Sequence, residues 1–333
     1  MIIFTLLLYA LLLFAPRKEV FTFDLSNTAL LKAILPFFII VGHAAHAVKS
    51  SVFDGLGVYV VALFFFVSGY GLEYKRSVDS KDSKDSMHLL VNRIVKLLFP
   101  LVVPIIIYVG IRWVSEGIGF SFIFIYQSIR SYEIILPYSW FIISLVQMYI
   151  LYYVSHYIHL KYLKGEGFLV LLSVVITLYI AILYSLHIQS TYYCSLYGFL
   201  AGVLFRYYEP IIKKIRFKSL LASVLLLSSI MIMIMKLPFT MLYNSWIFCV
   251  ACALIISLIQ LKGRVIDFFS KISYEMYICQ GIGIYLSHML VDRYVCVWGG
   301  KCLFCCLAII ITILIALFSN KLTKTLFGNY SKK

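Results

Sequence analysis

The chain has few charged residues, and acidic ones are especially scarce. Only 13% of its 333 residues are Asp, Glu, Lys or Arg, and 14 acidic residues stand against 29 basic ones. So little charge cannot cover the surface of an ordinary soluble domain, which excludes that class. Apolar runs of around 20 residues recur along the whole length, as membrane spans require. Because each span must satisfy its own backbone, we predict an all-α fold, a polytopic transmembrane helical bundle.

Hydropathy predicts about eleven spans, a core of ten helices preceded by one N-terminal span. They cover residues 2–15, 29–48, 54–73, 93–114, 139–158, 168–187, 191–207, 219–236, 242–261, 270–290 and 302–321. The chain thus divides into a membrane anchor at 1–20, a transmembrane domain at 21–321 and a tail at 322–333. The first run is also short enough for a signal peptide. Its charges, Arg17 and Lys18, follow the apolar run, however, which favours an anchor.

The net charge is +15, and the basic residues are divided unevenly between the connections on the two sides of the predicted membrane spans. Of the 29 Lys and Arg residues, 22 fall in the connections after odd-numbered spans or in the C-terminal tail, and 6 fall in the other connections. The positive-inside rule then predicts an integral plasma (inner) membrane protein with its N-terminus outside and its C-terminus in the cytoplasm. The expected surroundings are the lipid bilayer, and no nucleic-acid partner is predicted. The oligomeric state stays open.

Metal and carrier signals are weak. Among the eight cysteines, Cys249 with Cys252 and the group Cys302, Cys305 and Cys306 imitate a metal spacing, but no histidine or carboxylate accompanies them. Small polarizable residues are ordinary in helix packing, so we predict no metal. The chain also lacks the matched halves typical of secondary transporters, which weakens a transporter interpretation.

Lys32 and His43 are the most informative pair, because both lie in one apolar segment with little other polar company. Eleven residues of helix place them within about 20° of each other on one face and about 16 Å apart along the axis. His43 is a candidate general base, since imidazole titrates near neutral pH. A packing histidine that bonds to a neighbouring helix is the alternative. For Lys32, snorkelling to the membrane edge is the alternative.

Two further cations fall at the predicted depth of Lys32. Arg93 and Lys96 share one helix face at the start of the fourth span. Three cations at one depth would hold a polyphosphate such as that of coenzyme A, although the positive-inside rule alone also explains them. The pantetheine arm of coenzyme A would extend on the order of 15 Å, close to the axial gap between Lys32 and His43.

Four residues on the predicted outer side are candidates for substrate contact. His46 lies one turn beyond His43 and is the second candidate base, unless it is simply an interfacial histidine. Asp54 and Glu133 are candidates to orient His43, whereas Glu73 and Glu275 lie towards the cytoplasm. Trp140 begins the fifth span, where it would stack on a sugar ring or serve as an interfacial anchor.

Four stretches of the sequence resemble the integral-membrane acyltransferase family three. They are Lys32 to His43 with its basic residue, gap and histidine, the phenylalanine-rich run ending in Ser68-Gly69, the basic segment Asn92 to Pro100, and the Ser-Tyr helix Ser270 to Gln280. The chain departs from the family at Gln280, where a histidine is frequent, and at Lys32, where arginine is more usual. Ser68-Gly69 is interpreted as a close helix contact rather than as a covalent acyl carrier.

The resemblance implies an acyl-CoA-dependent O-acyltransferase that modifies a cell-surface or lipid-linked glycan. His43 would be the catalytic base, and Lys32, Arg93 and Lys96 would engage the acyl donor, acetyl-CoA or another acyl-CoA. The acceptor glycan is the expected second partner. One alternative is a carrier or flippase for an anionic or glycan substrate, which binds through His43 and Lys32 without covalent chemistry. A structural membrane subunit without turnover is a third interpretation.

Overall fold

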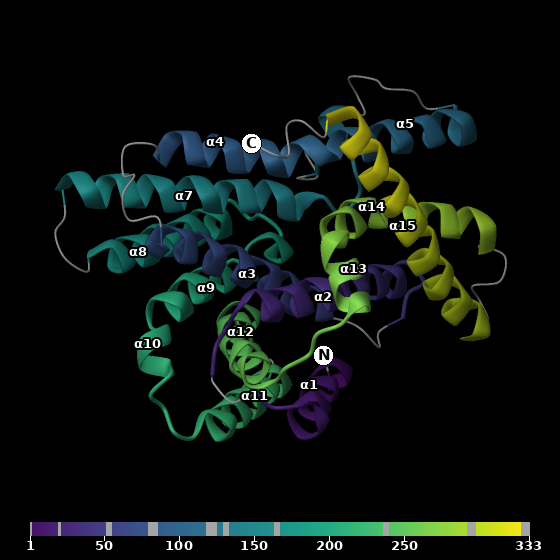
Figure 1. Ribbon diagram of the computed structural model, residues 1–333. Coiled ribbons are helices and arrows are strands. Elements are labelled where there is room, and N and C mark those ends of the chain that lie inside the picture. Colours follow the sequence, from purple (N-terminus) through teal and green to yellow (C-terminus); the bar gives the residue numbers. More distant parts are fainter. Residues whose placement is uncertain are drawn as a thin grey trace. The chain divides into compact units, whose positions relative to one another are not determined.

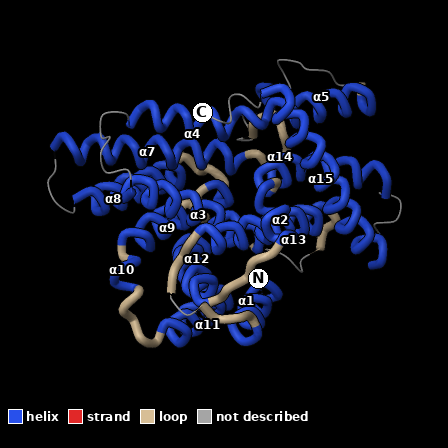
Figure 2. The backbone as a smooth tube through the Cα atoms, in the orientation of Figure 1, coloured by secondary structure: helices blue, strands red, loops and turns tan. Residues whose placement is uncertain are grey.

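The computed structural model describes residues 2–18, 21–50, 55–78, 86–117, 125–128, 133–162, 167–235, 240–291 and 298–327. Throughout these residues the regular elements are helices (Figures 1 and 2). Eight described helical stretches, one of them made of consecutive helices, are long and apolar enough to cross a membrane: Leu25–Ala47, Leu56–Ser77, Met87–Glu116, Trp140–Tyr162, Gly167–Ser185, Lys218–Met235, Thr240–Leu258 and Gly299–Leu326. The protein is therefore a polytopic helical membrane protein, which confirms the predicted class.

The other three predicted spans are also helical, but they differ from the eight in length or polarity. Helix α1 (Ile2–Phe14) has 13 residues and α9 (Tyr197–Tyr207) has 11, so each is shorter than the hydrocarbon core is thick. Helix α14 (Ser273–Val291) has 19 residues but carries polar side chains, among them Glu275 and Gln280. Most of α14 is buried in protein, which explains why it tolerates these side chains.

The chain folds as two compact units. The first unit comprises Met1–Leu35, Gly55–Met87 and Gln147–Ser270, and the second comprises Pro36–Asp54, His88–Val146 and Lys271–Lys333. Helices α2 (Leu25–Ala47) and α7 (Trp140–Tyr162) contribute to both. The first unit also holds α1, α3 (Leu56–Val78), α8 (Gly167–Ser185), η4 (Ser190–Tyr192), α9, α10 (Glu209–Ile212), α11 (Lys218–Met235), α12 (Thr240–Leu258) and nearly all of α13 (Arg264–Lys271). The second holds most of α4 (Ser86–Leu98), η3 (Phe99–Leu101), α5 (Val102–Glu116), α14 and α15 (Trp298–Phe327).

Glycines bring α3 and α9 into backbone contact in the first unit. A Cβ atom at Gly202 would lie 2.1 Å from the Phe66 carbonyl oxygen, and one at Gly198 would lie 2.2 Å from that of Ala62. A Cβ atom at Gly69 would meet the Phe199 carbonyl oxygen at 2.2 Å. Gly198 and Gly202 are four residues apart on α9, and small residues at this spacing let membrane helices approach closely. The close helix contact predicted at Ser68-Gly69 is thereby confirmed for Gly69.

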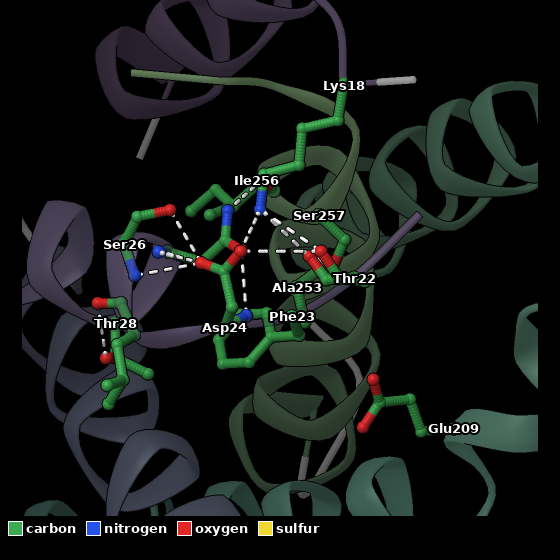
Figure 3. A network of polar contacts seen from close by, with 12 residues as sticks. Lys18, Thr22, Phe23, Asp24, Ser26, Thr28, Glu209, Ala253, Ile256 and Ser257 are labelled. Atoms are coloured by element: carbon green, nitrogen blue, oxygen red, sulfur yellow. Dashed lines mark hydrogen bonds and ion pairs between the residues drawn. The ribbon is translucent and has the colours of Figure 1, made fainter. Parts of the chain in front are cut away.

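The start of α2 is fixed by a polar network in the first unit, drawn in Figure 3. Asp24 caps the helix, because its Oδ1 accepts the backbone N–H groups of Ser26 at 2.8 Å and Asn27 at 3.2 Å. The Lys18 ammonium donates to Asp24 Oδ2 at 2.8 Å and to Asn27 Oδ1 at 2.7 Å. Burial alone would raise the pKa of Asp24, but the hydrogen bonds from Lys18, Ser26 and Asn27 hold it well below its usual value.

In the second unit, the predicted span 93–114 is interrupted near its start. Helix α4 ends at Leu98, η3 follows, and α5 begins at Val102. Pro100 has no backbone N–H and cannot continue the helical ladder, which accounts for the change of helix type. The Tyr274 hydroxyl of α14 donates a hydrogen bond to the Leu97 carbonyl just before this break. Helices α14 and α15 pack closely on each other, since a Cβ atom at Gly283 would meet Thr312 Oγ1 at 2.1 Å.

Candidate active site

His43 lies in the last two turns of α2, in the second unit, and its ring stacks on Tyr138. The two ring centroids are 4.1 Å apart and the planes differ by 25°. The histidine is partly buried. Among the residues that the structure describes, its ring nitrogens make no hydrogen bond. The contact therefore fixes the plane of the imidazole and leaves both nitrogens available for proton transfer.

Tyr138 belongs to a tight connection, residues 133–139, that leads into α7. Ile135 and Tyr138 both have left-handed backbones, with φ of 64° and 65°. Residues other than glycine adopt this conformation at a cost, and it persists only where surrounding contacts enforce it. Ser139 supplies two such contacts, because its Oγ accepts the Ile134 N–H at 2.7 Å and its hydroxyl donates to the Leu136 carbonyl at 2.6 Å.

Helix α14 holds the same connection from its other end. The Tyr277 hydroxyl donates a 2.6 Å hydrogen bond to the Tyr138 carbonyl oxygen. One turn further on, a Cβ atom at Gly281 would lie 2.7 Å from the Pro137 carbonyl oxygen, so this position has no room for a side chain. Tyr277 also meets the Phe141 ring edge to face, at 5.2 Å between centroids. These contacts define the candidate site: His43, Tyr138 and the α14 face that carries Tyr277 and Gly281.

Glu133 contacts the site through the backbone rather than through His43. Its Oε1 accepts the Tyr138 N–H at 2.8 Å. Burial raises the pKa of the Glu133 carboxyl above its usual value, and the hydrogen bond from Tyr138 only partly offsets this. Burial likewise raises the pKa of the Tyr138 phenol, and the neighbouring Glu133 charge adds to the effect. The observed position makes Glu133 a support for Tyr138.

The other predicted site residues are dispersed. Arg93 is half-buried and Lys96 is exposed on α4 of the second unit, close to the Leu97 carbonyl that Tyr274 contacts. Lys32 is exposed on the part of α2 that belongs to the first unit. His46 is exposed at the end of α2. Trp140, the first residue of α7, is half-buried two residues after Tyr138.

Asp54 and Glu73 are two further carboxylates considered as partners of His43. Asp54 lies outside the described residues. Glu73 lies buried in the first unit, where it pairs with Arg76 and accepts the Tyr152 hydroxyl at 2.9 Å. No pattern in the sequence indicates the stacking of Tyr138 on His43, although Tyr138 lies two residues before Trp140. Tyr277 lies within the Ser-Tyr stretch, but residue spacing does not reveal its partner, the Tyr138 carbonyl.

The fold and the site define a class: a polytopic helical membrane protein with a histidine held inside one of its units. Residues 27–319 match the membrane acyltransferase family three, described as an acyltransferase domain. This match covers most of the chain, so the protein belongs to that family and is an acyltransferase. No curated protein and no solved structure matches the chain significantly.

Proposed function

We propose that the protein transfers an acyl group, acetyl in the first instance, from acyl-CoA to a hydroxyl group of a cell-surface or lipid-linked glycan. The observation that carries the proposal is the His43 imidazole, which is fixed in plane by Tyr138 while its nitrogens are left unbonded within the described part of the chain. A general base needs this combination of fixed orientation and a free nitrogen.

His43 would act in the following way. Its imidazole takes the proton of the acceptor hydroxyl as the oxygen attacks the thioester carbonyl carbon. The carbon–sulfur bond then breaks, and the imidazolium returns the proton to the departing thiolate. The products are an O-acyl glycan and free coenzyme A. Because the imidazole is regenerated, neither an acyl-enzyme nor a metal is needed for the balance of the reaction.

The donor side of the proposal rests on charge. Arg93 and Lys96 lie three residues apart on α4, so they share a helix face at the edge of a predicted span. Two fixed cations suit the phosphates of coenzyme A. A contribution from Lys32 stays a prediction from the sequence, as does the cytoplasmic entry of the donor, which follows from the charge asymmetry of the connections.

The test is acyl transfer by the purified protein in nanodiscs, with radiolabelled acetyl-CoA and a cell-envelope glycan fraction. We expect label in the glycan with the wild type and a loss of more than about 100-fold with His43→Ala. His88→Ala is the control, since His88 is an exposed histidine on α4 to which the proposal gives no role. It should stay within about threefold of the wild type.

Two results would contradict the proposal. Full activity of His43→Ala, with the variant's thermal stability unchanged, would remove His43 as the base. Movement of a glycan lipid across the membrane without incorporation of label would select the carrier interpretation instead. Circular dichroism and thermal melting of each variant show whether a loss of activity is a loss of fold.

A further inference from the structure

Gln280 is a buried polar side chain that no described contact satisfies. It lies in the middle of α14 with an exposed fraction of 0%. Neither its Nε2 nor its Oε1 has a hydrogen-bond partner in the described structure. Most buried polar side chains in native proteins are paired, so an amide with both ends unpaired calls for a specific explanation. The cost is greatest inside a membrane protein, where water is scarce.

The position of Gln280 relates it to the candidate site. It lies three residues after Tyr277, so the two side chains share one flank of the helix. It directly precedes Gly281, whose Cα faces the Pro137 carbonyl without room for a Cβ atom. Tyr277 bonds to the backbone of Tyr138, and the ring of Tyr138 stacks on His43. The unpaired amide thus lies on the helix that holds the connection 133–139 next to His43, and all of these residues belong to one unit of the structure.

We propose that Gln280 is a catalytic residue whose amide N–H binds the acyl carbonyl oxygen of the donor. This inference rests on the proposed function. As the acceptor oxygen bonds to the thioester carbon, the carbonyl electron pair moves onto its oxygen, and Gln280 Nε2–H donates a hydrogen bond to that oxyanion. The negative charge returns to form the carbonyl when the carbon–sulfur bond breaks, and His43 passes the hydroxyl proton to the thiolate. Donors of this kind act mainly in the transition state.

The decisive variant is Gln280→Leu, which keeps most of the side-chain volume and removes both polar atoms. If the amide is kept for catalysis, its removal relieves an unpaired buried group, so thermal stability should stay equal or rise. At the same time kcat should fall by about 100-fold, while the KM for acetyl-CoA changes little. A merely structural glutamine, bonded to an ordered water, predicts the opposite change in stability.

Ser287→Ala is the matched control on the same helix. Ser287 is equally buried, but its hydroxyl is satisfied by a 2.8 Å hydrogen bond to the Gly283 carbonyl. This variant should lower stability slightly and leave kcat within about threefold. Gln280→Leu with near wild-type kcat, or with kcat and melting temperature falling together, would overturn the inference.

The wild type and His43→Ala, assayed beside these variants, separate the two proposals. If the wild type transfers label and His43→Ala does not, a fully active Gln280→Leu refutes the role of Gln280 alone. If the wild type fails to label any glycan while it moves a glycan lipid, the proposed function fails, and the role of Gln280 fails with it.

Discussion

The hydrogen bond from Tyr277 to the Tyr138 carbonyl provides the sharpest test of how His43 is positioned. Tyr277→Phe removes one oxygen atom and leaves the carbonyl of Tyr138 without its 2.6 Å partner. An unpaired backbone group at a buried position costs about 1–3 kcal/mol. Tyr138 also has a left-handed backbone, with φ of 65°, that nearby contacts must enforce. We therefore expect the connection 133–139 to lose its fixed conformation in this variant.

The magnitude follows from the free energy. If a loss of about 2 kcal/mol falls entirely on the conformation that stacks Tyr138 on His43, kcat falls about 30-fold, since 1.4 kcal/mol is a factor of ten. The KM for acetyl-CoA should change little, because the variant alters the position of the proposed base, His43, rather than the proposed donor site on α4. Steady-state acyl transfer at saturating acceptor, with the donor concentration varied, separates the two parameters.

Tyr274→Phe is the matched control for this prediction. Tyr274 lies on the same helix, and its hydroxyl also donates to a backbone carbonyl, that of Leu97 on α4. Both variants should lose similar thermal stability, but Tyr274→Phe should keep kcat and at most raise the KM for the donor. Equal falls in kcat for the two variants would mean that the general loosening of α14, and not the position of Tyr138, controls activity.

Two further predictions concern packing and charge. Gly281→Ala would place a Cβ atom 2.7 Å from the Pro137 carbonyl oxygen. We expect this variant to lose about 1–3 kcal/mol of folding free energy and to have at least tenfold lower kcat. Gly110→Ala is the control, because a Cβ atom there meets open space, and it should change neither the melting temperature nor kcat. Asp24 has a depressed pKa in the folded state, so its stabilising contribution is present above its ordinary value of 3.8 and is lost as the pH falls further. Asp24→Asn should accordingly melt below the wild type at pH 7, and the gap should narrow only below about pH 4. A difference in melting temperature between Asp24→Asn and the wild type that stays constant from pH 7 to pH 2 would contradict this prediction for Asp24.

Much of the fold follows from the sequence because lipid imposes simple rules. A run such as residues 168–187 has no other stable state than a helix, and the structure has α8 there. Hydropathy predicts a helix less well where the helix is surrounded by protein instead of lipid. Hydropathy predicts a span at 270–290, but α14 is buried enough to carry Glu275 and Gln280 and is not among the eight described stretches long and apolar enough to cross a membrane. Helix α9 has 11 residues and is shorter than the predicted span 191–207, and two of its glycines lie against the backbone of α3.

The candidate site shows a different limit. His43 stands out in the sequence because a histidine in an apolar helix has few neutral explanations. The stacking partner, Tyr138, does not stand out in the sequence, because it lies about 95 residues further along the chain in a connection with two left-handed residues, Ile135 and Tyr138 itself. Hydrophobic periodicity does not predict a left-handed backbone conformation. Glu133, a predicted candidate to orient His43, accepts the backbone N–H of Tyr138 with its carboxylate, and residue spacing cannot reveal such a contact.

Among the residues that the structure describes, an aromatic ring rather than a carboxylate lies beside His43, and this has a chemical consequence. A carboxylate would fix one tautomer and stabilise the imidazolium, but a charged partner inside a membrane unit is costly. A stacked ring fixes only the plane of the imidazole, so either nitrogen can hold the proton. In the proposed reaction the same imidazole first receives a proton from a hydroxyl group and then gives it to a thiolate. An imidazole without a fixed hydrogen-bond partner suits these two proton transfers, because neither transfer has to break a hydrogen bond to such a partner.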